Sequence, residues 1–216
     1  MAYGQNYFTD RKYTFKQRLI ERHVLEVLRW ATKKLEVNLL SGVGKRALDV
    51  GCACGYTTHV LEGLGYDAVG MDLSLWSTKQ AKTLCDGDFL VCDAQTPLPV
   101  CDGFDLVTCF DVIEHLPNPE KALANMFEVC RGVMVCTTPN KKVEKFVRTL
   151  TSDYDETHIN VKLPGAWKQL FTDILGFGSL EVGVFYDLPL RLGGNFFFKS
   201  FSIPVYGLTV RLAAKR

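Results

Sequence analysis

The sequence contains no run of about 18 apolar residues, so no membrane-spanning helix is expected. None of its 8 cysteines form a Cys-x-x-Cys pair, which argues against a zinc ribbon, and no metal site is expected. No Gly-Lys-Ser/Thr tripeptide occurs, which excludes a Walker-type phosphate loop. The first ten residues lack the basic start and apolar stretch of a secretion signal, so we expect a cytoplasmic protein with reduced cysteines.

Composition is that of one globular domain. The chain has 216 residues, of which 47% are hydrophobic and 23% charged. We expect a single domain over residues 1–216, with a helical cap at 1–40 and the core at 45–216. The net charge of +1 conceals an acidic middle between basic flanks. The acidic middle of the sequence favours a cationic ligand. The basic residues of the two flanks favour an acidic substrate, or they simply lie on solvent-exposed helix faces.

Periodicity predicts a sheet with helices on both of its faces. Residues 14–36 have the apolar spacing of an amphipathic helix. Short apolar strands and helices then alternate, which is typical of a mostly parallel sheet. Two later strands, 180–186 and 205–212, have no helix between them and predict an antiparallel edge. Long loops are expected at 141–163 and 187–204. The alternating strands are expected at 47–50, 68–71, 89–92, 105–109 and 133–137, and the helices at 57–64, 74–84 and 119–130.

The most informative segment is Leu48-Asp-Val-Gly-Cys-Ala-Cys-Gly55. A buried strand ends there in a glycine-containing turn that opens a helix, and such a turn allows a ligand close to the backbone. The carboxylate of Asp49 would repel a phosphate, so the pattern favours a cationic ligand over ATP or NAD. The dinucleotide fingerprint Gly-x-Gly-x-x-Gly is also missing from this turn.

Acidic residues end the next two strands as well. Asp72 follows the second strand and Asp93 the third. In open α/β sheets ligands bind at the carboxyl ends of the strands, where a carboxylate can accept hydrogen bonds from ribose hydroxyls. Either residue alone is also explained as a loop acid or a helix N-terminal acid. Three strand-end acids in series, together with Asp49, favour an adenosine-type ligand.

The first motif resembles motif one of class I S-adenosylmethionine-dependent methyltransferases, which reads Asp-x-Gly-x-Gly-x-Gly; this chain has Ala53 at the middle glycine. The segment Phe104-Asp-Leu-Val-Thr-Cys-Phe-Asp-Val-Ile-Glu-His-Leu-Pro117 resembles the family's fourth-strand motif. It is most similar to the branch that methylates small molecules, including ubiquinone precursors. The resemblance implies a Rossmann-like, doubly wound, mostly parallel seven-stranded sheet with an antiparallel edge strand. It also implies S-adenosylmethionine as cofactor.

The resemblance also implies roles for individual residues. Asp72 would bind the ribose, Leu73 would pack on the adenine, Asp93 and the backbone of Ala94 would read the adenine edge, and Cys109 and Phe110 would lie against the methionine part. The full set of expected cofactor-binding residues is Asp49, Gly51, Cys52, Ala53, Gly55, Asp72, Leu73, Asp93, Ala94, Cys109 and Phe110.

His115 and His158 are the candidate catalytic residues. Attack on a sulfonium methyl depends mainly on positioning, so a base is needed only for a weakly acidic hydroxyl. Each histidine is equally well explained as a substrate contact or as a residue that holds a loop.

A small-molecule acceptor is expected, because apolar residues crowd positions 186–201 and no run of Lys and Arg suits a nucleic acid. Two alternatives remain open: an RNA methyltransferase that uses the basic flanks, and a non-catalytic protein that binds the cofactor. The aromatic residues Tyr3, Tyr7, Phe8 and Tyr13 are expected either to close over the site as a lid or to dock on the core.

Overall fold

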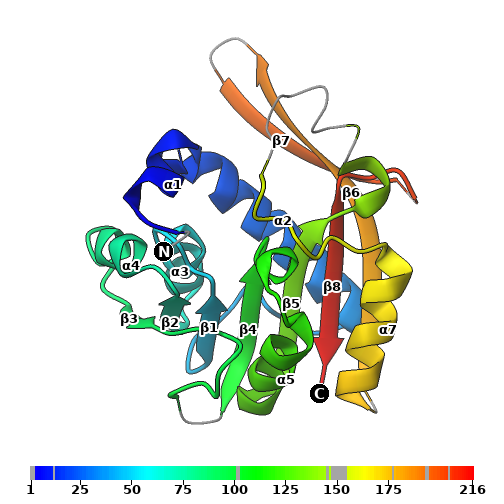
Figure 1. Ribbon diagram of the computed structural model, residues 1–216, viewed down its shortest axis with the longest axis horizontal. Coiled ribbons are helices and arrows are strands. Elements are labelled where there is room, and N and C mark those ends of the chain that lie inside the picture. The colour runs from blue at the N-terminus through cyan, green and yellow to red at the C-terminus, as the bar shows by residue number, and fades with distance from the viewer. Residues whose placement is uncertain are drawn as a thin grey trace.

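The computed structural model describes residues 3–11, 13–100, 103–144, 146, 155–176, 178–192, 195–203 and 205–216. These residues form one eight-stranded sheet in the order β3-β2-β1-β4-β5-β8-β6-β7 (Figure 1). Its strands are β1 (Arg46–Val50), β2 (Asp67–Asp72), β3 (Asp88–Val91), β4 (Phe104–Phe110), β5 (Cys130–Pro139), β6 (Ser179–Leu192), β7 (Asn195–Ser202) and β8 (Thr209–Lys215). The helices are α1 (Gln5–Asp10), α2 (Gln17–Leu35), α3 (Tyr56–Gly63), α4 (Leu75–Ala81), α5 (Pro119–Val129) and α7 (Pro164–Leu175), with short 3-10 helices η1 (Tyr13–Lys16) and η2 (Ile113–His115).

The first five strands form the parallel part of the sheet. Strands β1, β2 and β3 pair in parallel toward one edge, and β1, β4 and β5 pair in parallel toward the other. The order of the strands therefore reverses between β1 and β4: β2 and β3 extend the sheet on one side of β1, and β4 and β5 extend it on the other. In such sheets a ligand-binding crevice lies outside the carboxyl ends of the strands at this switch point. The predicted α/β fold with a mostly parallel sheet is confirmed.

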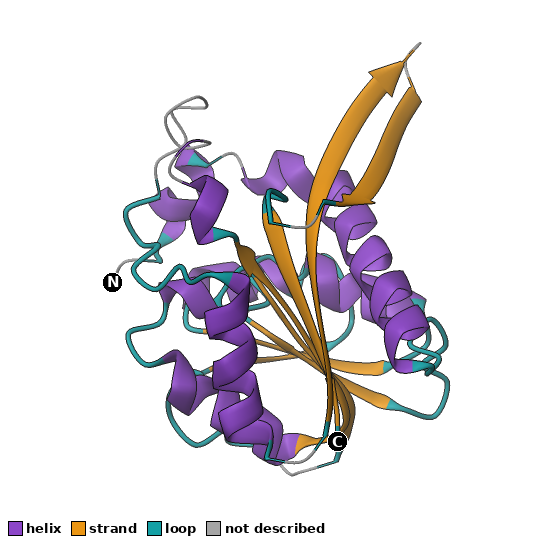
Figure 2. Cartoon of the chain, turned by 90° about the vertical axis from the view of Figure 1, so that its right-hand side faces the viewer, coloured by secondary structure: helices purple, strands orange, loops and turns teal. Residues whose placement is uncertain are grey.

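The strand count differs from the expected seven. Strand β8 lies between β5 and β6 and is antiparallel to both. Most of residues 187–204, expected to be a loop, belongs instead to a β6–β7 hairpin that projects beyond the rest of the sheet (Figures 1 and 2). Pro189 lies where β6 pairs only with β7, and an edge of this kind tolerates proline.

Helices cover both faces of the sheet (Figure 2). Helices α2 and α3 pack on one face with the core around Leu28 and Leu61, and α5 and α7 pack on the other with the core around Leu123 and Trp167. None of the helices within the described ranges is long and apolar enough to cross a membrane.

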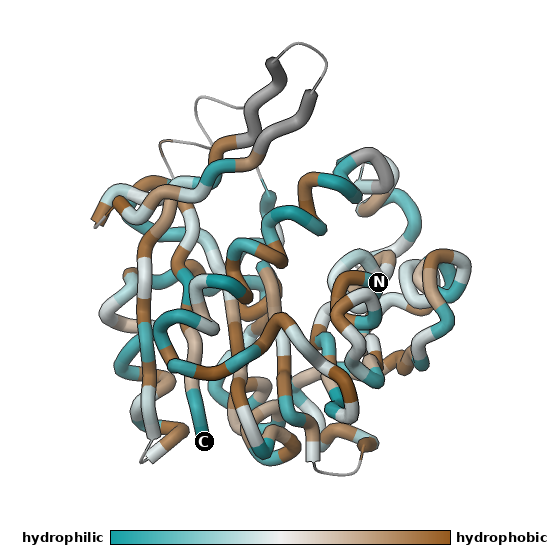
Figure 3. Tube along the Cα trace, turned by 180° about the vertical axis from the view of Figure 1, so that it is seen from behind, coloured by the Kyte–Doolittle hydropathy of each residue, from teal (hydrophilic) through white to brown (hydrophobic). Residues whose placement is uncertain are grey.

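Helix α2 shows how the sequence pattern produces this packing. Val24, Val27, Leu28 and Ala31 recur at helical spacing and are all completely buried. Polar residues alternate with them along the helix, which crosses the sheet on the side seen in Figure 3. The helix ends where Glu36 adopts a left-handed conformation, with φ of 53°.

Burial in α7 generates a stability prediction. The side chain of Phe171 is 1% exposed, whereas that of Leu163, just before the helix, is 49% exposed. We expect Phe171→Ala to lower the free energy of unfolding by about 3–5 kcal/mol, because it leaves a cavity in the core. Leu163→Ala should change it by less than about 0.5 kcal/mol. Urea denaturation of both variants measures the difference, and equal losses would show that α7 does not pack as described.

Candidate active site

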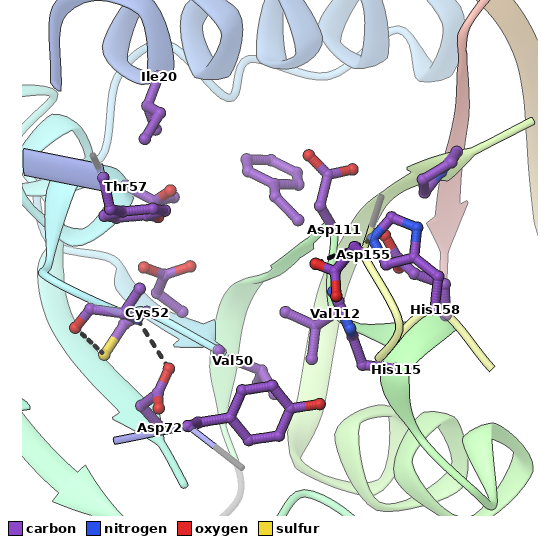
Figure 4. Close-up of a pocket in the computed structure, with 18 of the residues that line it drawn as sticks. Ile20, Val50, Cys52, Thr57, Asp72, Asp111, Val112, His115, Asp155 and His158 are labelled. Carbon is purple, nitrogen blue, oxygen red and sulfur yellow. Dashed lines mark hydrogen bonds and ion pairs between the residues drawn. The ribbon is translucent and has the colours of Figure 1, made fainter. Parts of the chain in front are cut away.

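A cavity of about 740 Å³ opens at the carboxyl ends of β1, β2, β3 and β4. Its volume is in the range of small-molecule sites. Figure 4 shows Cys52 and Asp72 on one side of it, with Asp111, His115, Asp155 and His158 on the other. The cavity therefore lies at the switch point of the sheet, where the strand-end acids were expected to converge.

The turn after β1 depends on unusual backbone angles. Gly51 and Gly55 have φ of 77° and 83°, values that side chains rarely tolerate. A Cβ on Gly51 would also lie 2.2 Å from Cγ2 of Val112. Ala53, in the place of the usual middle glycine, has φ of 47°, and its N–H donates to Oδ2 of Asp72 at 2.9 Å. That hydrogen bond ties the β1 turn to the end of β2.

Asp49 is buried at the end of the central strand. Only 2% of it is exposed, and it accepts hydrogen bonds from Oγ1 of Thr58 and Oγ1 of Thr108, each at 2.9 Å. Burial raises the pKa of the Asp49 carboxyl to about 6, although the two threonine hydroxyls act in the opposite direction. A buried anion of this kind is stabilised by any cation that enters the cavity.

Asp72 and Asp93 continue the acidic wall. Oδ1 of Asp72 accepts from the N–H of Ser74 at 2.7 Å, and burial raises the pKa of the Asp72 carboxyl. Oδ1 of Asp93 accepts from the N–H of Gln95 at 2.9 Å. Both residues line the cavity, so three carboxylates from successive strand ends face one space.

Most of the predicted cofactor-binding residues lie in this wall, but two do not. Gly51, Cys52, Ala53, Leu73, Ala94 and Phe110 line the cavity together with the three acids. Cys109 is completely buried in the core instead, because successive residues of a strand point to opposite faces and its neighbour Phe110 takes the cavity side. Gly55 is also outside the lining; it begins α3, and a Cβ there would lie 2.8 Å from Cβ of Ala81.

The opposite wall holds a group that we call the histidine–carboxylate cluster: Glu114, His115, Asp155 and His158. The two histidine rings lie edge to face, with centroids 4.6 Å apart. Nδ1 of His115 is 2.8 Å from Oγ1 of Thr157, and Nδ1 of His158 is 2.7 Å from Oε1 of Glu144. The structure thus brings the two predicted catalytic residues together, although 43 positions separate them in the sequence.

Burial sets the charges within the histidine–carboxylate cluster. It lowers the pKa of His115 to about 4, and the neighbouring His158 acts in the same direction, so His115 is neutral near pH 7. Burial also raises the pKa of Glu114 well above its usual value. Burial acts to raise the pKa of Asp155, but hydrogen bonds from Thr157 and the positive charge of Arg11 outweigh this effect, so the pKa is lowered.

Aromatic residues of the N-terminal segment form part of the cavity wall. Tyr3, Tyr7, Phe8 and Tyr13 all line it, so the four aromatic residues singled out in the sequence share one location. Phe8 stacks on Trp76 with ring centroids 5.4 Å apart, and Tyr13 stacks on Tyr56 at 5.6 Å. These contacts join α1 and η1 to α3 and α4.

His23 and Asp187 are cavity residues that the sequence analysis did not select. Nδ1 of His23 lies 3.2 Å from Oδ2 of Asp187, whose Oδ1 lies 2.6 Å from NH2 of the buried Arg211. The sequence carried one signal: His23 occurs beside Val24 on the apolar stripe of α2. Of the aromatic residues expected at 186–201, Phe198 lines the cavity, and the side chains of 189–197 lie outside the described residues.

The chain is similar to known methyltransferases in sequence. The profile of a family described as "Methyltransferase domain" matches residues 20–177. The ubiquinone biosynthesis O-methyltransferase of Glaesserella parasuis is 26% identical over 137 residues, covering 58% of this chain and 57% of that protein. The 18S rRNA (guanine-N(7))-methyltransferase bud23 of Schizosaccharomyces pombe is 32% identical over 106 residues, covering 48% of this chain and 35% of that protein. The chain therefore matches less than two thirds of either relative's length.

The fold is also similar to solved structures. A SAM dependent methyltransferase from Archaeoglobus fulgidus superimposes with a TM-score of 0.70 at 16% identity, covering 98% of this chain and 100% of that one. At this identity the similarity supports the fold and not the substrate. It agrees with the sheet order and the helix layers described above.

The raised pKa of Asp49 generates a prediction about stability. Because its native pKa of about 6 exceeds the usual value, its contribution to the free energy of unfolding is largest below about pH 4 and is lost as pH rises through 6. Asp49→Asn removes this titration. Relative to wild type, its free energy of unfolding should therefore rise by on the order of 2 kcal/mol between about pH 4.5 and 7.5.

Urea denaturation at the two pH values measures this change. Asp67→Asn is the matched control, because the Asp67 side chain is 75% exposed on the neighbouring strand. A difference between Asp49→Asn and wild type that stays constant with pH would contradict the assignment of the raised pKa to Asp49.

Proposed function

The chain belongs to the family of methyltransferase domains, and we propose that it transfers a methyl group from S-adenosylmethionine to an acceptor bound in the cavity. The observation that carries the proposal is the cavity itself. Three carboxylates and a glycine turn line one wall, and the histidine–carboxylate cluster lines the other. The first wall suits a cationic nucleoside, and the second suits the group that it methylates.

On the acidic wall each strand end has a separate task. Asp72 accepts hydrogen bonds from the ribose hydroxyls. Asp93 and the N–H of Ala94 form hydrogen bonds with the edge of the adenine ring. Asp49 lies at the centre of the switch point, where its charge stabilises the positively charged methionine part. The turn at Gly51 exposes backbone without a side chain to the cavity, which allows the cofactor to approach closely. A side chain at this position would in addition collide with Val112.

Methyl transfer then needs positioning more than acid–base chemistry. The acceptor atom attacks the methyl carbon in line with the sulfur, the new bond to carbon forms as the S–CH3 bond breaks, and the sulfonium becomes a neutral thioether. His115 and His158 lie opposite Asp72 (Figure 4), which supports the proposal that they contact the acceptor. The N-terminal cap, residues 1–40, acts as a lid that excludes water during the reaction.

The charge of the cavity favours a small acceptor over RNA. Its lining contains eight carboxylates but only Arg11 and Lys16 as permanent cations. A polyanion needs a basic surface, so this lining repels it. The similarity to an O-methyltransferase of ubiquinone biosynthesis supports a small hydroxylated acceptor, whereas the similarity to bud23 keeps RNA as the second candidate.

Cofactor binding tests the first part of the proposal. We expect isothermal titration calorimetry to show one S-adenosylmethionine per chain. Asp72→Asn should weaken binding at least tenfold, because a charged hydrogen-bond acceptor for the ribose is lost. Asp67→Asn, at the exposed start of the same strand, is the control and should bind as wild type does. Unchanged affinity in Asp72→Asn would remove Asp72 from the site.

The acceptor class is tested by labelling. The full chain is incubated with S-adenosylmethionine carrying a labelled methyl group and with cell extract, and the products are separated into RNA, protein and small molecules. We expect the label in the small-molecule fraction. Label in RNA, accompanied by RNA binding that weakens steeply with salt, would contradict the small-molecule proposal, because phosphate contacts produce that salt dependence.

A further inference from the structure

The cavity has a further side, between α2 and the β6–β7 hairpin, where a histidine lies beside a carboxylate. His23 of α2 and Asp187 of β6 both line it, and their side chains are only 17% and 11% exposed. We propose that Nε2 of His23 binds the hydroxyl group of an aromatic acceptor and accepts its proton, and that Asp187 positions the imidazole. This subsite deepens the proposed function and rests on it.

Asp187 is held in place as an anion. Its Oδ1 accepts hydrogen bonds from NH2 of the buried Arg211 and from Oγ of Ser200, each at 2.6 Å. Burial acts to raise the pKa of the Asp187 carboxyl, but His23, Arg211 and Ser200 outweigh this effect, so the pKa is lowered. The other oxygen, Oδ2, faces His23. The fold therefore presents a fixed negative charge to one edge of the imidazole.

This charge determines which nitrogen of His23 can accept a proton. Nδ1 of His23 lies 3.2 Å from Oδ2 of Asp187. An ionised carboxylate only accepts hydrogen bonds, so Nδ1 carries the proton and the neutral ring has its lone pair on Nε2. Nε2 is buried and has no hydrogen-bond partner among the described residues. A polar atom buried in this way is costly, so a ligand hydroxyl that donates to it is favoured.

Aromatic side chains surround the imidazole and indicate the class of acceptor. The ring centroid of His23 lies 6.5 Å from that of Phe110 and 6.1 Å from that of Phe198, with interplanar angles of 83° and 79°. Both phenylalanines line the cavity, and Figure 4 shows Ile20, one turn before His23 on α2, directed into it. Apolar and aromatic walls around one hydrogen-bond acceptor suit a planar ring that carries a hydroxyl group.

The other two histidines of the cavity are less suited to accept a proton. Burial lowers the pKa of His115 to about 4, which makes its imidazole a weak base. Both ring nitrogens of His158 face carboxylates: Nδ1 is 2.7 Å from Oε1 of Glu144, and Nε2 is 3.6 Å from Oδ2 of Asp155. His23 has a carboxylate at one nitrogen and, within the described part of the chain, no partner at the other.

The subsite assigns a destination to the proton that leaves the acceptor. As the acceptor oxygen attacks the methyl carbon, its proton passes to Nε2 of His23. The O–CH3 bond forms, the S–CH3 bond breaks, and the electron pair of that bond stays on sulfur. The charge of Asp187 stabilises the resulting imidazolium, which then releases the proton to water. His115 and His158 remain contacts of the acceptor and need not act as bases.

Binding of p-nitrophenol tests the subsite without the cofactor. The phenolate form of this probe absorbs visible light, and the full chain is titrated into it at a pH where most of the free probe is protonated. We expect saturating protein to raise the phenolate absorption about threefold or more, because His23 takes the proton and holds the anion beside it. His23→Phe, which keeps an aromatic ring, should abolish this rise and weaken binding roughly tenfold.

The matched control is His59→Phe, the same change at an exposed histidine of α3, which should give the wild-type rise. If His23→Phe does not fold, judged by thermal unfolding, Asp187→Asn replaces it. That variant should lose the rise too, because the asparagine amide can donate to Nδ1 and so place the proton on Nε2.

The subsite is wrong if wild type gives no rise, or if the variant at His23 or Asp187 keeps it. Calorimetry of wild type with S-adenosylmethionine tests the proposed function separately. Normal cofactor binding alongside a failed p-nitrophenol titration would leave that function intact, so the two failures are distinguishable.

Discussion

The buried carboxylate of Asp49 is the feature on which the rest of the cavity depends. It lies at the end of the central strand, where hydroxyls from α3 and β4 hold it, so three elements meet at one anion. Burial makes that anion costly, which is why its pKa rises to about 6. A fold retains such a cost at a functional position when a ligand offsets it. Here the offsetting ligand is the cationic cofactor.

A buried carboxylate is also found on the opposite wall of the cavity. Glu114 is buried more completely than Asp49, a hydrogen bond with Thr138 offsets only part of the effect of that burial on its pKa, and two histidines lie beside it. Both walls therefore place buried carboxylates against the cavity, from β1 and β2 on one side and from the turn after β4 on the other. Between them lies the space in which a methyl group would pass from sulfur to the acceptor atom. Aromatic residues of the N-terminal segment and Phe198 of the hairpin also line that space.

Much of the fold could be predicted from the sequence because local pattern determines it. The helix expected at 14–36 and the strand at 47–50 correspond to α2 and β1, since apolar periodicity marks both. The hairpin at 187–202 was expected to be a loop, because the pairing of β6 with β7 is not visible in the local sequence pattern. The resemblance to the methyltransferase family implied seven strands, and the structure has eight in the residues that it describes.

The site was predicted only in part. Strand-end acids such as Asp72 could be located, because strand ends define the edge where ligands bind. Glu114 and the pair of His23 and Asp187 were missed, since their importance comes from contacts between distant segments. Cys109 was misplaced because the sequence does not show which face of β4 meets the cavity.

Proton release on cofactor binding tests the central claim most directly. Calorimetry of S-adenosylmethionine binding in two buffers of different ionisation enthalpy counts the protons released. Near pH 6 Asp49 is about half protonated in the free protein, and a cationic ligand favours its charged form. The account predicts release of about half a proton at pH 6 and almost none near pH 8. Binding without proton release at pH 6 would contradict it.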